Sequence, residues 1–273
     1  MDSNQIELRR LCPTIGAEVE GVDLSEALTA DIKDRLHAAL LEHKVLFFRN
    51  QNISVNQQMA FARSFGDLEV HPFFKPSGIP ELLEIVHDEN SPPNQNNWHT
   101  DASWRLNPPF ASVLRAVEVP KVGGDTLFAD MCAAYESLSF AMQRMLSGLT
   151  AIHDFSHILG RNLEPAKFKE MQAQYPPAEH PVIRTHPGTG RKLIFVNPAF
   201  TTHIVGLAPE ESKRLLEYLY LRTWTPEFQC RFRWERNSIA FWDNRATQHY
   251  AVGDYFPNRR VMHGLRIVGD KPY

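Results

Sequence analysis

The carboxyl-terminal part of the chain, residues 229–268, reads QCRFRWERNSIAFWDNRATQHYAVGDYFPNRRVMHGLRIV. Three short runs in it, residues 229–234, 238–242 and 260–268, are rich in aromatic and aliphatic side chains. The segments between them contain Asn, Asp, Gly and Pro, which favour turns. This pattern predicts three β-strands at the end of the chain.

The same alternation of short strands and turns extends toward the middle of the chain. We predict strands at residues 82–86, 110–119, 126–128 and 192–196, with a turn at Gly123-Gly124-Asp125. Apolar residues at helical spacing predict helices at 29–43, 133–149 and 208–222, and a further helix between Ser54 and Gly66. Many short strands with interposed helices favour a mainly β fold with helical insertions, a double-stranded β-helix or jelly roll.

The chain shows no internal repeat or flexible linker, so residues 1–273 are expected to form one domain. The segment from about 154 to 180 has no steady periodicity and contains Pro165, Pro176 and Pro177. We expect it to lie outside the sheets as a lid, because loops of this length are often functional.

Composition limits the classes of function. The formal net charge of -3 comes from 29 Lys and Arg against 32 Asp and Glu, which gives no basis for binding nucleic acid or an anionic membrane. Three widely spaced cysteines, Cys12, Cys132 and Cys230, match no disulfide framework. No signal peptide or membrane span is evident, so we expect a cytoplasmic protein.

The motif Trp98-His99-Thr100-Asp101, together with His249, is the strongest candidate for a metal site. On a strand, residues i and i+2 point to one face, so His99 and Asp101 could hold one ion. Two imidazoles and one carboxylate are the ligand set of mononuclear Fe(II) sites with open positions. Spacing alone also permits a chance His and Asp in a turn, and a Zn(II) hydrolase could use the same ligands.

Several further motifs carry a family resemblance. They are GAEVEGVDL at 16–24, GGDT at 123–126, HPVIRTHP at 180–187 and WDNRATQHY at 242–250. Together with the 98–101 motif they resemble the taurine dioxygenase / 2,4-dichlorophenoxyacetate dioxygenase family of Fe(II)- and 2-oxoglutarate-dependent oxygenases, and above all its taurine branch.

The resemblance implies a jelly roll that holds Fe(II) through His99, Asp101 and His249. It also implies that Arg260 and Thr126 bind the co-substrate 2-oxoglutarate. Arg260 suits this role because a guanidinium meets a carboxylate with two parallel hydrogen bonds and keeps its charge. The reaction implied is hydroxylation of a small organic substrate with O2, which releases succinate and CO2.

The pattern of the taurine enzymes breaks around the expected substrate. Their sulfonate-binding Arg lies four residues beyond the co-substrate Arg, and here that position is Gly264. His71 matches a substrate-contacting His, whereas Phe74 replaces an expected Tyr and Gln95 lies in an altered loop. Two further residues, Phe155 and Phe200, match aromatic wall positions. We therefore expect a more apolar pocket and a substrate other than taurine.

Arg266 leaves two interpretations open. In a regular strand it shares a face with Arg260 and Gly264, so it could bind a longer anionic substrate. It could equally form an ion pair at a sheet edge.

The favoured function is a dioxygenase that hydroxylates a small molecule, with cleavage where the hydroxylated carbon bears a heteroatom. A taurine or alkylsulfonate dioxygenase is the alternative within the family, despite Gly264. A catalytically inactive ligand-binding member is the alternative from another class, although no ligand is missing from the sequence. The resemblance also implies a homodimer or homotetramer.

Overall fold

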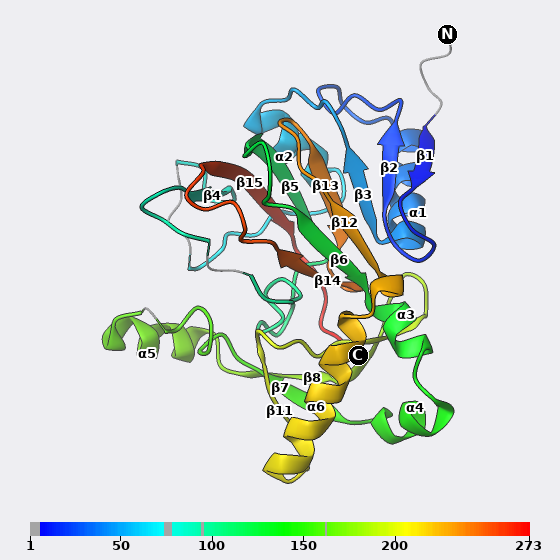
Figure 1. Ribbon diagram of the computed structural model, residues 1–273, viewed down its shortest axis with the longest axis vertical. Coiled ribbons are helices and arrows are strands. Elements are labelled where there is room, and N and C mark those ends of the chain that lie inside the picture. The colour runs from blue at the N-terminus through cyan, green and yellow to red at the C-terminus, as the bar shows by residue number, and fades with distance from the viewer. Residues whose placement is uncertain (1–5, 74–77, 94–95, 162) are drawn as a thin grey trace.

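The computed structural model describes residues 6–73, 78–93, 96–161 and 163–273. Its centre is a seven-stranded sheet that faces a three-stranded sheet (Figure 1). This arrangement of facing sheets with added helices confirms the predicted jelly roll.

The large sheet combines strands from both ends of the chain. In spatial order its strands are β1 (Glu7–Arg10), β2 (Ala17–Glu20), β3 (Val45–Phe48), β13 (Ile239–Asp243), β5 (Ala111–Glu118), β15 (Arg260–Ile267) and β4 (Leu83–His87). The interior strands β13, β5 and β15 pair antiparallel, whereas β2 and β3 pair parallel.

The facing sheet has the order β12 (Gln229–Phe232), β6 (Thr126–Asp130) and β14 (Thr247–Ala251). Aromatic side chains fill the space between the two sheets. The Phe47 ring of β3 stacks on Phe232 of β12 with centroids 4.0 Å apart, and it meets the edge of Phe128 of β6 at 5.6 Å. Burial of these rings holds the two sheets together.

Two smaller sheets lie at the other end of the molecule (Figure 1). They are β11 (Thr201–Ile204), β7 (Thr150–His153) and β8 (Ala178–Pro181), and the pair β9 (Ile183–Thr185) and β10 (Lys192–Ile194).

The helices are α1 (Ala30–His43), α2 (Val55–Arg63), α3 (Met131–Glu136), α4 (Phe140–Leu146), α5 (Pro165–Gln174) and α6 (Pro209–Thr223), with a 3-10 turn at Pro226–Phe228. The predicted helix at 133–149 is wrong, because two helices occupy that stretch. The Ser139 hydroxyl accepts from Met142 N at 3.2 Å and starts α4 as a new helix.

The 154–180 segment is more ordered than expected. It contains α5, and its last residues form β8, so it does not lie wholly outside the sheets. Figure 1 shows α5 projecting to one side, away from the seven-stranded sheet. Among the residues described, none of the helices combines the length and apolar character needed to cross a membrane.

Candidate metal centre and its two cavities

Three predicted ligands converge at one point of the structure. His99, Asp101 and His249 each offer a ligand atom within 4.8 Å of the other two. His249 lies on β14, and its backbone joins that of His99 by hydrogen bonds of 2.9 and 3.1 Å. The fold therefore brings the two distant motifs together.

The expectation that His99 and Asp101 share a regular strand is wrong. His99 forms an isolated bridge, and Asp101 begins a turn that passes through Ala102 at a φ of +46°. The side chain of Asn244 holds this turn. Asp101 N donates to Asn244 Oδ1 at 2.8 Å, and Asn244 Nδ2 donates to Asp101 O at 3.0 Å.

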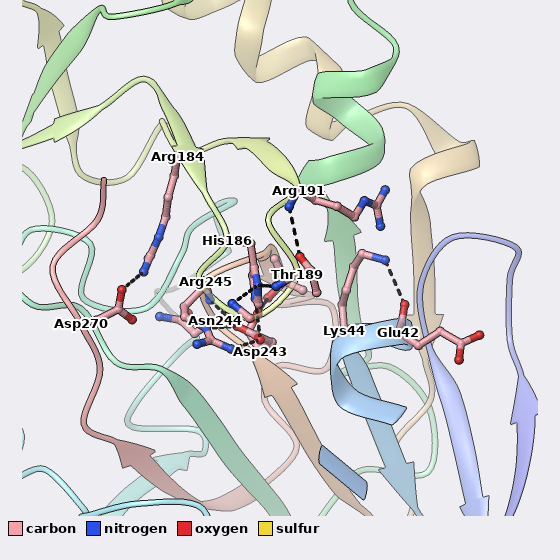
Figure 2. A network of polar contacts seen from close by, with 12 residues as sticks. Glu42, Lys44, Arg184, His186, Thr189, Arg191, Asp243, Asn244, Arg245 and Asp270 are labelled. Atoms are coloured by element: carbon pink, nitrogen blue, oxygen red, sulfur yellow. Dashed lines mark hydrogen bonds and ion pairs between the residues drawn. The ribbon is translucent and has the colours of Figure 1, made fainter. Parts of the chain in front are cut away.

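Asn244 is held by the backbone of Pro109 and Phe110, and it lies between Asp243 and Arg245, which belong to a buried polar network (Figure 2). Asp243 accepts from Arg245 Nη2 at 2.6 Å and pairs with His186 Nε2 at 2.9 Å. Burial alone would raise the pKa of Asp243, but these hydrogen bonds outweigh it and keep the pKa well below its usual value. Asn244 lies within the WDNRATQHY motif, but its contact with Asp101 could not be predicted from sequence because the two residues are 143 positions apart.

The protonation of the three candidate ligands suits a metal ion. Burial lowers the pKa of His99, and it lowers that of His249 to about 3. Burial opposes ionisation of the Asp101 carboxyl, but the charge of Arg266 and the hydrogen bond from Ser112 keep its pKa below the usual value. Two neutral imidazoles and an ionised carboxylate are the states that bind a metal.

The orientation of the side chains also fits. His99 Nδ1 lies 2.9 Å from Asn97 O, which leaves Nε2 for a metal. His249 makes no side-chain hydrogen bond to a described residue, so its ring nitrogens are available. The donor set therefore fits Fe(II), which accepts two His and one carboxylate and keeps open positions.

The first of two cavities at this centre contains the predicted co-substrate residues. Arg260 and Thr126 line it together with all three candidate ligands. Arg260 is only 5% exposed, and among the described residues it forms no ion pair. The Arg260 guanidinium has a hydrogen bond with Tyr255, whereas its Nε is buried without a hydrogen-bond partner. A buried cation without a counter-ion is costly, so this cavity is suited to an anionic ligand.

Gly264 also lines the first cavity, beside Leu83 and Leu114. A Cβ built at Gly264 would lie 3.5 Å from Leu83 Cβ and 3.6 Å from Leu114 Cδ1, which are ordinary contacts. A Cβ is therefore tolerated at this position, and its nearest neighbours are the apolar side chains of Leu83 and Leu114.

The second cavity meets the first at the candidate ligands. Both are lined by His99, Asp101 and Arg266, and the second adds the predicted residues His71 and Phe200. Burial, followed by the charge of Arg266, lowers the pKa of His71 to about 2, so its imidazole is neutral. The remaining wall is mainly apolar and includes Trp104, Ile158, Leu159 and Ala199.

Arg266 is the residue whose position was least expected. Its backbone is paired on both sides: Arg266 lies opposite Ser112 of β5, and beyond the end of β4 its carbonyl oxygen accepts from Glu69 N at 3.0 Å. Its Nη2 donates to Asp101 Oδ1 at 2.7 Å, while its Nη1 is buried without a hydrogen-bond partner. Arg266 therefore joins the candidate metal site to both cavities.

The other predicted substrate residues divide into two groups. Phe155 does not line either cavity and packs behind Trp104, with ring centroids 5.7 Å apart. Phe74 and Gln95 lie outside the described residues.

Comparison with known proteins places these features in a family. The family model described as "Taurine catabolism dioxygenase TauD, TfdA family" matches residues 7–266. A relative from Pseudomonas putida, an alpha-ketoglutarate-dependent sulfate ester dioxygenase, is 34% identical over 277 residues, which cover 98% of this chain and 91% of the relative.

Two solved structures have a similar fold along nearly the whole chain. A taurine dioxygenase from Burkholderia xenovorans is 39% identical with a TM-score of 0.85, over 98% of this chain and 90% of that one. The enzyme AAD-2, in complex with Mn(II) and N-oxalylglycine, is 29% identical with a TM-score of 0.85, over 98% of this chain and 99% of that one. The chain therefore belongs to the TauD/TfdA family, and it is a 2-oxoglutarate-dependent dioxygenase.

Proposed function

We propose that this dioxygenase hydroxylates a small apolar substrate that carries one anionic group. His99, Asp101 and His249 would hold Fe(II), and Arg260 and Thr126 would bind the distal carboxylate of 2-oxoglutarate. The observation that carries the proposal is the meeting of two cavities at the candidate ligands, one of them with a buried Arg260 that forms no ion pair with a described residue.

The bound Fe(II) and 2-oxoglutarate supply the oxidising chemistry, in which one oxygen atom of O2 enters a C–H bond and the other enters succinate. The protein's own residues bind and orient the reactants. The apolar walls formed by Trp104 and Phe200 would exclude water from the reacting carbon.

The charges around the second cavity favour an anion. The Arg266 guanidinium uses one nitrogen for Asp101 and has a second, buried nitrogen without a partner. His71 is neutral, and the nearby Glu69 is engaged by Arg105 at 2.6 Å. An anionic head group could therefore bind Arg266 while its hydrocarbon part contacts Ile158 and Leu159.

The names of the relatives are consistent with this class. One acts on sulfate esters and one on taurine, and both kinds of substrate carry a sulfur oxyanion. Taurine also carries an ammonium group and has almost no apolar body, so the mainly apolar second cavity suits it poorly. Where the hydroxylated carbon bears the ester oxygen, the product would collapse to an aldehyde and release sulfate.

The test is succinate formation by the purified protein with Fe(II), 2-oxoglutarate, O2 and matched substrates. Hexyl sulfate and heptanoate carry the same six-carbon chain as 1-hexanol, which has no anion, and taurine has the anion without that chain. We expect the two anions to stimulate succinate formation at least about tenfold more than 1-hexanol or taurine.

Two outcomes would contradict the proposal. Equal stimulation by 1-hexanol would exclude the anionic class, and preferential turnover of taurine would support the taurine alternative. A protein that neither binds 2-oxoglutarate nor forms succinate with any substrate would be an inactive ligand-binding member of the fold.

We further propose a cytoplasmic homodimer or homotetramer. The three cysteines are unpaired, which suits a reducing compartment. Large apolar side chains are exposed on and just beyond α4 and α6, among them Phe140, Leu221 and Trp224, and a second copy of the chain could cover them. Light scattering that gives the mass of a single chain would contradict this assembly.

A further inference from the structure

The Thr126 hydroxyl is oriented by a residue outside the cavity. Trp234 Nε1 donates to Thr126 Oγ1 at 2.9 Å in a buried contact. An indole N–H can only donate, whereas a hydroxyl has one proton and two lone pairs. Thr126 therefore accepts from Trp234, and its own proton must point elsewhere.

That proton is directed to no acceptor in the part of the chain that the structure describes. Thr126 is 2% exposed and lines the first cavity, where Arg260 is also without an ion-pair partner. A buried donor without an acceptor is costly. Two such donors in one cavity favour a ligand that accepts hydrogen bonds from both.

The fold holds Trp234 firmly in place. Thr126 is the first residue of β6, and it is paired in register with Phe232, the last residue of β12. Trp234 follows two residues later and packs edge-on against the Phe232 ring, with centroids 5.0 Å apart. Trp234 is 5% exposed and does not line the cavity.

We propose that Trp234 is a positioning residue for the co-substrate. Its indole N–H occupies a lone pair of Thr126, so that the Thr126 hydroxyl donates to the distal carboxylate of 2-oxoglutarate beside Arg260. This inference rests on the proposed function, because it takes 2-oxoglutarate as the occupant of the first cavity. Trp234 acts through Thr126 and does not touch the co-substrate.

The test is calorimetric titration of 2-oxoglutarate into the Mn(II)-loaded protein, in which no turnover is needed. Hydrogen bonds to charged groups are stronger than neutral ones, so Thr126→Val should weaken binding about 10- to 100-fold. Trp234→Phe keeps an aromatic ring and removes the N–H, and it should weaken binding about 5- to 20-fold. When Thr126 is already Val, the further change Trp234→Phe should raise the 2-oxoglutarate Kd by less than about twofold.

Phe232→Leu is the matched control, because it disturbs the packing around Trp234 and leaves the N–H donor. It should lower the melting temperature and change the 2-oxoglutarate Kd by less than about twofold. If Trp234→Phe folds poorly, Trp234→Leu removes the same N–H donor, and the Kd is measured on whichever variant keeps a cooperative melting transition.

Three outcomes are distinguishable. An unchanged Kd in Trp234→Phe, or full additivity with Thr126→Val, overturns the positioning role while the proposed function stands. Failure of the unsubstituted Mn(II)-loaded protein to bind 2-oxoglutarate overturns both. A Mn(II) affinity that falls in Trp234→Phe also contradicts the inference, because Trp234 would then act on the metal site.

Discussion

Every polar atom of Asp101 has a partner. Its Oδ1 accepts from Arg266 at 2.7 Å and its Oδ2 from Ser112 at 2.8 Å, and Asn244 binds its backbone N and O. These contacts fix both the side chain and the turn that carries it. Of the three candidate ligands, Asp101 is thus the one whose position depends on side chains from several distant strands.

Asn244→Ala should weaken metal binding without removing a ligand. The substitution leaves the buried N and O of Asp101 without partners, and loss of groups that orient ligands typically costs 10- to 100-fold in metal affinity, so we expect a change of about that size. Mn(II) titration measures it, with the exposed Asn52→Ala as control. An unchanged Mn(II) affinity would show that Asp101 keeps its position without Asn244.

Arg260 and Arg266 should separate binding of the co-substrate from binding of the substrate. Arg260→Gln should raise the Kd of 2-oxoglutarate about 10- to 100-fold, because Arg260 is the buried cation beside Thr126. Arg266 also holds Asp101, so Arg266→Gln is assayed at saturating metal; there it should raise the KM of an anionic substrate about 10- to 100-fold and affect the 2-oxoglutarate Kd less. If both variants changed the 2-oxoglutarate Kd and the substrate KM to the same extent, the assignment of separate roles would be contradicted.

At the level of elements, the small sheet β7-β8-β11 supports the segment that carries the metal motif. His153 of β7 and Asn197 both contact Ser103 Oγ, at 3.1 and 2.8 Å. His180 of β8 contacts Arg105 O through Nε2 at 2.9 Å. Burial lowers the pKa of His153, and it lowers that of His180 to about 4.

Because burial lowers the pKa of these imidazoles, we expect the folded protein to lose stability in acid. The unfolded chain takes up a proton on His180 near pH 6.5, while the folded chain does so only near pH 4. The free energy of unfolding should therefore fall as the pH drops from 6.5 to 4, by about 1.4 kcal/mol per pH unit for this group. Above pH 6.5 both states are neutral and His180 contributes no pH dependence.

His180→Gln should reduce this slope, because Gln can still donate to Arg105 O and does not titrate. Urea unfolding between pH 4 and 7 measures the slope, and His203→Gln at an exposed position is the control. A slope in His180→Gln equal to that of the unsubstituted protein would show that His180 is protonated in the folded state.

We propose that the 154–180 segment acts as the lid of the second cavity. Ile158 and Leu159 line that cavity, whereas Leu163 packs in the same apolar cluster without lining it. Ile158→Ala and Leu159→Ala should therefore raise the KM of an apolar substrate about tenfold and leave the 2-oxoglutarate Kd unchanged. Leu163→Ala is the matched control, and an equal rise of KM in it would point to general loosening of the cluster.

The elements differ in how far sequence could predict them. The strands β5 and β15 were predicted to within two residues at each end, because runs of aliphatic residues bounded by turns are local signals. The start of α4 could not be predicted, because helical spacing of apolar residues does not show that the Ser139 hydroxyl caps a new helix. The turn at Asp101 could not be predicted, since Asn244, which holds it, is distant in the chain.

At the level of the whole molecule, the two facing sheets bring together residues proposed to bind the metal, the co-substrate and the substrate. β14 carries His249, β6 carries Thr126, and β15 carries both Arg260 and Arg266. The metal ligands and the co-substrate residues could be named from sequence through their motifs. The ion pair of Arg266 with Asp101 could not be predicted from sequence, because it depends on how the strands pack.

A crystal structure of the protein with Mn(II) and N-oxalylglycine would decide whether this centre works as proposed. We expect Mn(II) on His99, Asp101 and His249, with the distal carboxylate of the analogue on Arg260 and Thr126. Mn(II) at another position, or the analogue's distal carboxylate on Arg266 in place of Arg260, would contradict the assignment of the two cavities.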